Sequence, residues 1–301
     1  LWSIFDYLMP GFLYTYQKFR EEIELPIAVN QDANKMERLQ RMIRPFILRR
    51  LKGDVLKDLP EKIEENVFAR LDGEQMQLYD AYATRMKEML SQQNEKEFHK
   101  GRMQILSELT KLRQLCCDPA LVYENYEGGS AKLDLCIELI QSAVESGHKI
   151  LLFSQFTSMI EILTARLQEE SISYFVLQGS TKKEQRAQMV EQFNRDDTSV
   201  FCISLKAGGT GLNLTGADIV IHYDPWWNVA VENQATDRAH RIGQKNVVTV
   251  YKLIAKGTIE EKIIKLQQRK KELAEEILSG DEIKTASFQR EELLELLEER
   301  F

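Results

Sequence analysis

Short apolar segments alternate with longer amphipathic segments through the second half of the sequence, and this alternation restricts the fold more than any other feature. The apolar segments, which we expect to be strands, are 149–154, 174–178, 199–204, 218–224 and 247–254. The amphipathic segments, which we expect to be helices, are 132–146, 156–170, 181–195, 229–240 and 258–278. Strands that are apolar throughout need cover on both faces, as in parallel sheets flanked by helices. The sequence therefore predicts an α/β domain with a parallel sheet.

A helical region precedes this α/β pattern. Residues 1–60 are rich in aromatic side chains and predict several helices. The segment KIEENVFARL then alternates like a strand, and after Asp72 the period predicts two long helices that reach Leu115. Segment 118–132 contains Pro, Gly-Gly and Ser, so we expect it to connect the helices to the α/β domain.

The composition indicates a globular protein that does not enter a membrane. The 301 residues are 43% hydrophobic, which is enough for a sizeable core, yet no run of about 18 apolar residues occurs. The first residues lack the basic start and cleavage site of a signal peptide, and the four cysteines lack zinc-ligand spacing. We therefore expect no metal site and an intracellular protein, cytoplasmic or in the nucleoid if bacterial and nuclear if eukaryotic.

Charge is unevenly distributed along a chain whose formal net charge is −7. Residues 34–58 contain eight basic and three acidic side chains, whereas residues 281–301 contain three basic and seven acidic ones. This asymmetry is typical of a molecule with one phosphate-facing region, although an ordinary solvated helix face would also explain the basic segment.

Two arginines and a glutamine stand out in the segment QATDRAHRIGQ. On the predicted helix Gln234, Arg238 and Arg241 are spaced by four and then three residues, so they share one face. Two guanidinium groups on one face are too costly to bury without anions. They either lie on the surface, paired with neighbouring carboxylates, or neutralise a transferring γ-phosphoryl group as arginine fingers.

A glycine cluster follows one of the predicted strands. Gly208, Gly209 and Gly211 would let backbone amides approach a ligand closely, and Lys206 and Thr210 add a cation and a hydroxyl. A phosphate-binding loop is expected at the carboxyl end of a strand in an open α/β sheet. An ordinary tight turn remains the alternative.

Polar side chains also follow the predicted strand 149–154. Ser154, Gln155 and Thr157 could donate hydrogen bonds to phosphate oxygens. Polar residues after a strand are also common in loops without a ligand.

These segments together resemble the motifs of the second lobe in the Swi/Snf-type family of helicase superfamily two. FSQFT resembles the fourth motif, SLKAGGTGLNLTGAD the fifth, YDPWWN the aromatic segment after it, and QATDRAHRIGQ the sixth. PFILRRLKGDVLKDLPEK resembles the segment that joins the two lobes, and LWSIFDYLMPGFL resembles a helical protrusion of the first lobe. The resemblance spans residues 1 to about 275 and implies a RecA-like fold preceded by helical protrusions.

The resemblance also implies domain boundaries. These are a protrusion and connector from the first lobe at 1–70, a helical insertion at 71–130, a RecA-like helicase C-terminal domain at 131–257, and a brace helix with an acidic terminal helix at 258–301.

For catalysis, the resemblance implies that ATP lies between two lobes. Arg238 and Arg241 would be catalytic, and residues implied to contact the nucleotide are Gln234, Gly209, Gly211 and Asn213. ATP and Mg²⁺ would be held mainly by the first lobe, because the sequence contains neither a GxxxxGK[ST] motif nor a DExH-type motif. We therefore expect ATP hydrolysis by the full-length protein and none by this chain alone.

For binding, the resemblance implies double-stranded DNA, the N-terminal lobe of the same polypeptide and a DNA-bound protein as partners. The residues implied to contact DNA are Ser154, Gln155, Thr157, Lys206, Gly208, Thr210 and Trp227. Trp226 is expected in the core. Val229 stands where the family usually has proline, which affects the local turn.

Two other functions remain open from the sequence. One is the C-terminal lobe of an RNA helicase, which has a similar fold. The other is a nucleotide-independent DNA-binding module, although such a module would need no arginine finger.

Overall fold

The computed structural model describes residues 1–28, 32–47, 56, 59–93, 95–205, 207 and 211–278. These residues divide into two compact units. Described residues within Leu1–Lys57 and Lys265–Ser287 form the first, here called the helical unit. Those within Asp58–Ile264 form the second, here called the sheet unit. None of the described helices combines the length and apolar character needed to cross a bilayer.

The sheet unit is built on six parallel strands in the order β1-β6-β5-β2-β4-β3. The strands are β1 (Lys62–Arg70), β2 (Ile150–Ser154), β3 (Tyr174–Leu177), β4 (Val200–Ser204), β5 (Ile219–His222) and β6 (Val248–Lys256). Five of them fall within the segments that the alternation predicted as strands of the domain, give or take two residues. The expected α/β fold with a parallel sheet is confirmed.

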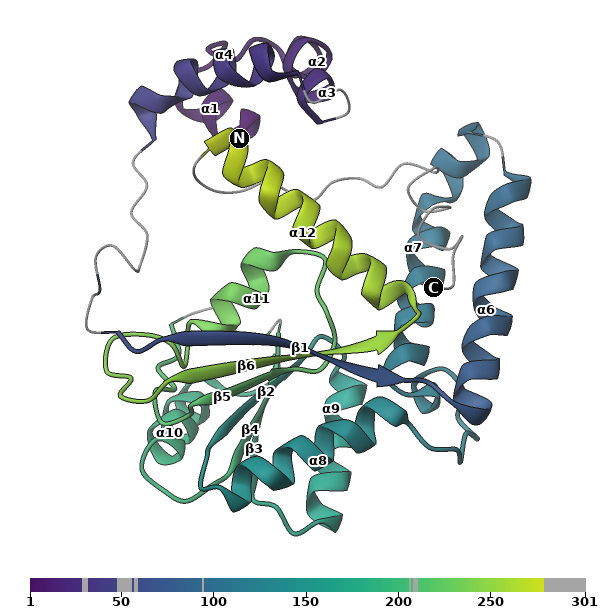
Figure 1. Ribbon diagram of the computed structural model, residues 1–301, viewed down its shortest axis with the longest axis vertical. Coiled ribbons are helices and arrows are strands. Elements are labelled where there is room, and N and C mark those ends of the chain that lie inside the picture. Colours follow the sequence, from purple (N-terminus) through teal and green to yellow (C-terminus); the bar gives the residue numbers. More distant parts are fainter. Residues whose placement is uncertain are drawn as a thin grey trace. The chain divides into compact units, whose positions relative to one another are not determined.

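Helices cover both faces of this sheet (Figure 1). Those of the sheet unit are α6 (Gly73–Gln92), α7 (Glu95–Cys117), α8 (Ala131–Glu145), α9 (Thr157–Glu169), α10 (Lys183–Phe193), α11 (Val229–Thr236) and the start of α12 (Ile259–Leu278). Helices α8 and α9 pack with Ile150 and Leu152 of β2, whereas α10 and α11 pack with Leu151 and Phe153. Because alternate residues of a strand point to opposite faces, the apolar run of β2 fills both cores.

Strand β1 corrects one expectation about the connector. It lies within residues 1–70, which the sequence assigned to the first lobe, yet it pairs with β6 from Lys62 opposite Val248 to Arg70 opposite Lys256. The two long helices α6 and α7 follow it directly. The strand is therefore an edge of the same sheet that carries the predicted site.

The helical unit has its own apolar core. Its described elements are α1 (Trp2–Leu8), α2 (Tyr16–Phe19), a π-helical turn (Arg20–Glu24), α3 (Leu25–Ala28), α4 (Ala33–Ile43), a 3₁₀ turn (Arg44–Phe46) and the part of α12 from Lys265. Phe5, Phe19, Leu39 and Ile43 are among its buried side chains. Asp32 begins α4 by accepting hydrogen bonds from the backbone of the first turn, which is the usual action of an N-cap aspartate.

Candidate nucleotide and DNA site

Those predicted site residues that the structure describes gather at the carboxyl edge of the parallel sheet. Strand β2 lies between β4 and β5, so the loops that leave these three strands are neighbours. The loop after β2 follows Ser154, the loop after β4 follows Ser204, and the loop after β5 follows His222. Ligands of open α/β sheets bind at this edge, where adjacent loops diverge.

Helix α11 ends earlier than the sequence predicted. Asn228 begins it by accepting a hydrogen bond from the Ala230 amide (3.0 Å), but its last helical residue is Thr236 rather than residue 240. The expectation that Gln234, Arg238 and Arg241 share one helix face is therefore wrong. Gln234 lies on α11 and is exposed, whereas both arginines lie in the turns that follow.

Long-range hydrogen bonds explain why the helix stops. The carbonyl of Arg238 accepts a hydrogen bond from the Leu214 amide (3.0 Å), so it is engaged by the segment after β4. Gly243 has a φ of 105°, which favours glycine and turns the chain toward β6. Periodicity within one helix cannot reveal the hydrogen bond from Leu214, because that bond depends on the tertiary fold, whereas Gly243 acts only beyond the end of the helix.

Arg238 is a buried cation against the central strand. Its exposed fraction is 6%, and its guanidinium carbon lies 5.5 Å from the centroid of the Phe153 ring. Burial lowers the pKa of Arg238 from 12.5 to about 10, so the side chain is still protonated at neutral pH. The aromatic face offers a weak electrostatic attraction to this charge.

Arg241 is half-buried and contacts the loop that follows β4. Its Nη1 donates to the carbonyl of Leu212 (3.3 Å). On either side of Leu212 lie Gly211, with a φ of 62°, and the exposed Asn213, whose carbonyl accepts a hydrogen bond from Asn194 Nδ2 (2.8 Å). The arginine turn and the described part of the glycine loop are thus in direct contact.

Gln244 fixes this contact, although sequence reasoning gave it no role. Its side chain is buried, and Nε2 donates to the carbonyls of Ala217 (2.8 Å), Ala239 (3.2 Å) and Thr215 (3.3 Å). Its Oε1 accepts hydrogen bonds from the next two backbone amides. A buried amide with this many partners holds the arginine turn to the segment after β4.

Ser154 differs from its expected role. The side chain is fully buried at the end of β2, and its Oγ donates to Asp224 Oδ1 (2.6 Å). The Gln155 amide also donates to this carboxylate (3.3 Å). The hydroxyl of Ser154 is therefore used inside the protein and does not reach phosphate in this arrangement. Burial raises the pKa of Asp224, while neighbouring Arg113 and the hydrogen bond from Ser154 oppose that rise.

The other residues expected to contact DNA are more accessible. Gln155 is half-buried and its side-chain Nε2 is enclosed, whereas Thr157 is exposed in the first turn of α9, where the first backbone amides of a helix can face an anion. Trp227 is half-buried after β5, while Trp226 packs against the core under α10 and α11, as expected. Lys206, Gly208, Gly209 and Thr210 lie outside the described residues.

Arg113 and Arg186 are two further polar residues of this edge that sequence reasoning missed. Arg113 is 3% exposed on α7, four residues after the buried Leu109, and that spacing could have placed it on the buried helix face. Arg186 of α10 donates to the carbonyls of Thr181 (2.8 Å), Gly179 (3.0 Å), Ala207 (3.1 Å) and Gln178 (3.3 Å). It therefore joins the loops after β3 and β4.

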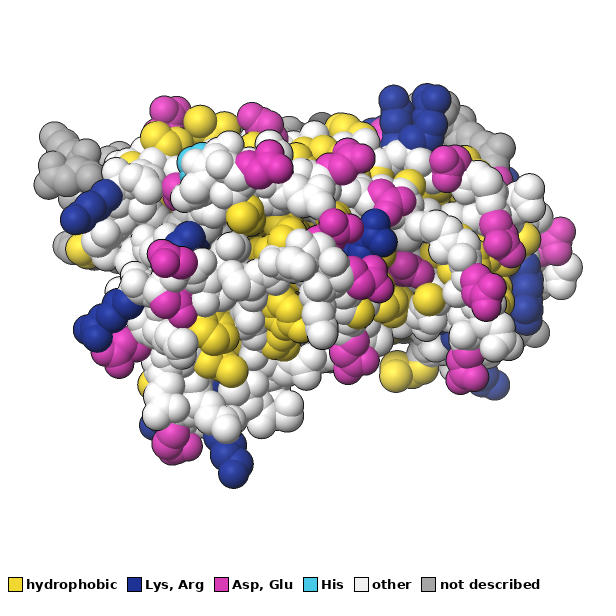
Figure 2. Space-filling view, turned by 90° about the horizontal axis from the view of Figure 1, so that it is seen from below, with side chains coloured by type: hydrophobic (Ala, Val, Ile, Leu, Met, Phe, Trp, Pro, Cys, Tyr) yellow, Lys and Arg dark blue, Asp and Glu magenta, His cyan; other side chains and the backbone are white. Residues whose placement is uncertain are grey.

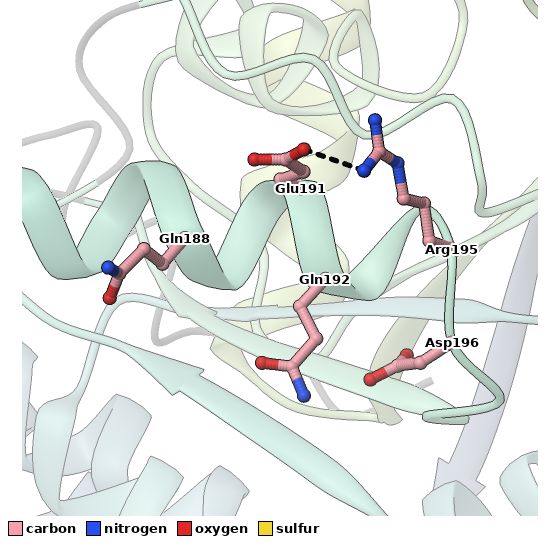
Figure 3. A pocket seen from close by; sticks show the side chains of 5 residues that line it. All are labelled: Gln188, Glu191, Gln192, Arg195 and Asp196. Carbon is pink, nitrogen blue, oxygen red and sulfur yellow. Dashed lines mark ion pairs between the residues drawn. The ribbon is translucent and has the colours of Figure 1, made fainter.

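A shallow hollow on α10 lies away from this edge and is a weaker candidate for a site. It is lined by Gln188, Glu191, Gln192, Arg195 and Asp196 (Figure 3). Arg195 and Glu191, four residues apart, form an ion pair along one side of it (2.8 Å), and Asp196 lies shortly before β4 begins, at the opposite edge of the sheet from the arginine turn. The face in Figure 2 mixes acidic, basic and apolar side chains without a continuous basic area among its described residues. No group of three His, Cys, Asp or Glu is placed to hold a metal within the described part of the chain.

Comparisons with known proteins agree in pointing to one family. The family described as "SNF2-related domain" matches residues 1–121, and that described as "Helicase conserved C-terminal domain" matches residues 131–243. An uncharacterized ATP-dependent helicase of Mycoplasma pneumoniae is 41% identical over 302 residues, which cover 99% of this chain and 28% of the relative. The chain thus spans little more than a quarter of that relative's length.

Solved structures give the same result. The Sulfolobus solfataricus SWI2/SNF2 ATPase core in complex with dsDNA is 36% identical, with a TM-score of 0.63 over 93% of this chain and 59% of that one. The C-terminal domain of a Sulfolobus solfataricus SWI2/SNF2 ATPase is 34% identical, with a TM-score of 0.59 over 73% of this chain and 91% of that domain. The latter match confirms the expected RecA-like fold.

Proposed function

The chain belongs to the Swi/Snf-type family of helicase superfamily two, and from this premise we propose that it forms the second motor lobe of an ATP-dependent double-stranded DNA translocase. One observation carries the proposal most directly. The turn with Arg238 and Arg241 is hydrogen-bonded to the segment after β4, so both lie together at the carboxyl edge of the sheet. Phosphate-binding machinery of α/β proteins occupies this edge.

In this proposal ATP lies between this lobe and the first lobe of the full-length protein. The first lobe would make most of the contacts to ATP and would hold Mg²⁺. The Mg²⁺ ion would shield the phosphate charge. Arg241, the more exposed of the two arginines, approaches the γ-phosphoryl group as it transfers, and Arg238 adds a second fixed positive charge. Residues proposed to contact the nucleotide beside them are Gln234, Gly209, Gly211 and Asn213.

The proposal also gives this chain the contacts to one strand of duplex DNA. The side chains and loop positions involved are Gln155, Thr157, Lys206, Gly208, Thr210 and Trp227. They offer amide, hydroxyl, ammonium and backbone donors, which fit phosphate oxygens better than base edges. Binding should therefore depend little on DNA sequence. The similar Sulfolobus ATPase core was solved in complex with dsDNA, which supports this choice of nucleic acid.

Closing and opening of the cleft between the lobes would move this lobe along the duplex. The chain alone would not hydrolyse ATP, because positioning of the nucleotide and neutralisation of its charge need both lobes. A protein bound to the DNA would be the object displaced or moved.

The arginine-finger assignment is tested by replacing Arg241 with alanine in the full-length protein. Arginine fingers contribute about 10³-fold or more to kcat, so we expect Arg241→Ala to reduce DNA-stimulated ATP hydrolysis by about that factor. Arg195→Ala is the matched control, because Arg195 is an exposed arginine of the same lobe that forms an ion pair with Glu191. An Arg241→Ala rate equal to that of the control would show that the assignment is wrong.

A further inference from the structure

We propose that Arg113 is a positioning residue for duplex DNA binding. From helix α7 it forms hydrogen bonds to both the loop after β2 and the loop after β5, and so holds these two loops together. The inference rests on the proposed function, since both loops carry residues assigned there to DNA contact. Arg113 itself is buried and touches no DNA in this proposal.

The guanidinium of Arg113 bridges two segments that are far apart in sequence. Its Nη1 donates to Gln155 Oε1 (2.9 Å), and its Nη2 donates to the carbonyl of Pro225. Gln155 follows β2, and Pro225 lies between β5 and Trp227. A planar guanidinium with two separately directed amino groups can satisfy both acceptors at once, whereas an ammonium group acts as a single point charge.

Aromatic rings of the same two loops lie within reach of this guanidinium. The carbon at its centre is 5.3 Å from the ring centroid of Trp227 and 5.8 Å from that of Phe156. Cations near aromatic faces are attracted by the ring quadrupole, more strongly where water is excluded. Arg113 therefore orients Trp227 as well as the backbone before it.

Asp224 extends the network to the backbone after β2. Its Oδ2 lies 4.0 Å from Arg113 Nη2, and the exposed fraction of both side chains is 3% or less. The same carboxylate accepts hydrogen bonds from Ser154 Oγ and the Gln155 amide. Removal of Arg113 would leave this carboxylate buried without its cation, so the geometry of both loops would change together.

This arrangement predicts an effect on DNA affinity more than on the chemical step. Phosphate contacts along one strand require groups at fixed separations, and exposed Thr157 after the β2 loop and Trp227 after β5 keep theirs only while the two loops are joined. The arginine turn is held separately, through Gln244 and Leu214. A purely structural role for Arg113 would lower stability and active fraction without changing the DNA concentration that gives half of the maximal rate.

The test measures ATP hydrolysis by the full-length protein as a function of duplex DNA concentration. For Arg113→Gln we expect the half-saturating DNA concentration to rise about tenfold, while kcat at saturating DNA changes less than about twofold. Arg113→Lys keeps the charge but reaches one acceptor, so a rise of about threefold is expected. Arg166→Gln is the control, because Arg166 is a partly exposed arginine on α9 that pairs with Glu169 and Glu170.

An Arg113→Gln protein that folds and keeps the parental half-saturating concentration overturns the proposal. If Arg113→Gln does not fold, Arg113→Lys decides, and an unchanged half-saturating concentration in that variant overturns the proposal equally. If duplex DNA fails to stimulate the unsubstituted protein, the proposed function is wrong and the inference falls with it. If duplex DNA stimulates the parent, and the Arg113 variants have the same half-saturating DNA concentration as the parent, the inference is wrong but the proposed function stands.

Discussion

At the scale of single residues, three arginines at the carboxyl edge of the sheet differ in their access to solvent and in their partners. Arg113 is 3% exposed and bonded to two loops, Arg238 is 6% exposed against Phe153, and Arg241 is half-buried beside Leu212. Arg241 is the most exposed of the three, and a ligand could replace its hydrogen bond to the Leu212 carbonyl at a low cost in free energy. This difference is the reason why Arg241 is the more informative residue to replace when the chemistry is tested.

His222 provides a pH-dependent test of the core beneath the site. It is fully buried, its Nε2 pairs with Thr236 Oγ1 (2.9 Å), and burial, with Lys252 adding to it, lowers its pKa from 6.5 to about 3. Between about pH 3 and pH 6.5 the imidazole of His222 is therefore protonated in the unfolded chain but neutral in the folded protein. Stability from this residue is present above pH 6.5 and is lost as the pH falls.

We expect the unfolding free energy to fall by about 2 kcal/mol more between pH 6.5 and pH 5 in the parent than in His222→Gln. Urea unfolding at several pH values measures this difference. His148→Gln, which removes a partly exposed imidazole, is the matched control. Parallel pH profiles for the parent and His222→Gln would contradict the account.

At the scale of elements, the strands were more predictable than the end of α11. Apolar runs such as 199–204 identify buried parallel strands because both of their faces are covered. The end of α11 at Thr236 depends on Leu214 and Gln244, which are remote from the helix in sequence or lie beyond its end. Local periodicity contains no information about such contacts.

The same reasoning explains which residues of the candidate site could be proposed from the sequence. The arginines and glycines occur in recognisable short motifs, whereas Arg113 acts through partners 42 and 112 positions away along the chain. The burial of Ser154 was missed for a similar reason, since its partner Asp224 follows a different strand. Motifs indicate a candidate site, but the tertiary fold decides which of its side chains remain available to a ligand.

A buried ion pair joins the first turn of α12 to the start of α8. Lys132 and Glu260 are both fully buried, and Glu260 Oε2 also accepts a hydrogen bond from the Ala255 amide (2.8 Å). Burial has the largest single effect and would lower the pKa of Lys132, but the Glu260 carboxylate, with smaller contributions from neighbouring groups, raises the pKa overall. The lysine therefore stays charged and depends on this carboxylate.

Replacement of Glu260 by Gln should reduce the unfolding free energy by about 3–5 kcal/mol, because it leaves a buried cation unbalanced. The added change Lys132→Met should restore much of this loss, since it removes the unbalanced charge. Glu169→Gln, at an exposed ion pair, should change stability by less than about 1 kcal/mol. Equal effects of Glu260→Gln and Glu169→Gln in urea unfolding would show that the pair does not stabilise the junction.

At the scale of the whole molecule, the chain corresponds to a part of the longer relatives that it matches. The Mycoplasma helicase is matched over only 28% of its length, although nearly all of this chain takes part in that match. In the proposed function, the edge of the sheet supplies cations and hydrogen-bond donors to phosphate, and a first lobe holds ATP. In the proposed function, translocation is therefore a property of the two lobes together.

ATP hydrolysis by the full-length protein with duplex DNA, single-stranded DNA or RNA is the most direct test of this account. Duplex DNA should raise kcat by about tenfold or more, single-stranded DNA and RNA should have much smaller effects, and residues 1–301 alone should show no hydrolysis. Stronger stimulation by RNA or by single strands, or hydrolysis by the isolated chain, would contradict the assignment as the second lobe of a duplex DNA translocase.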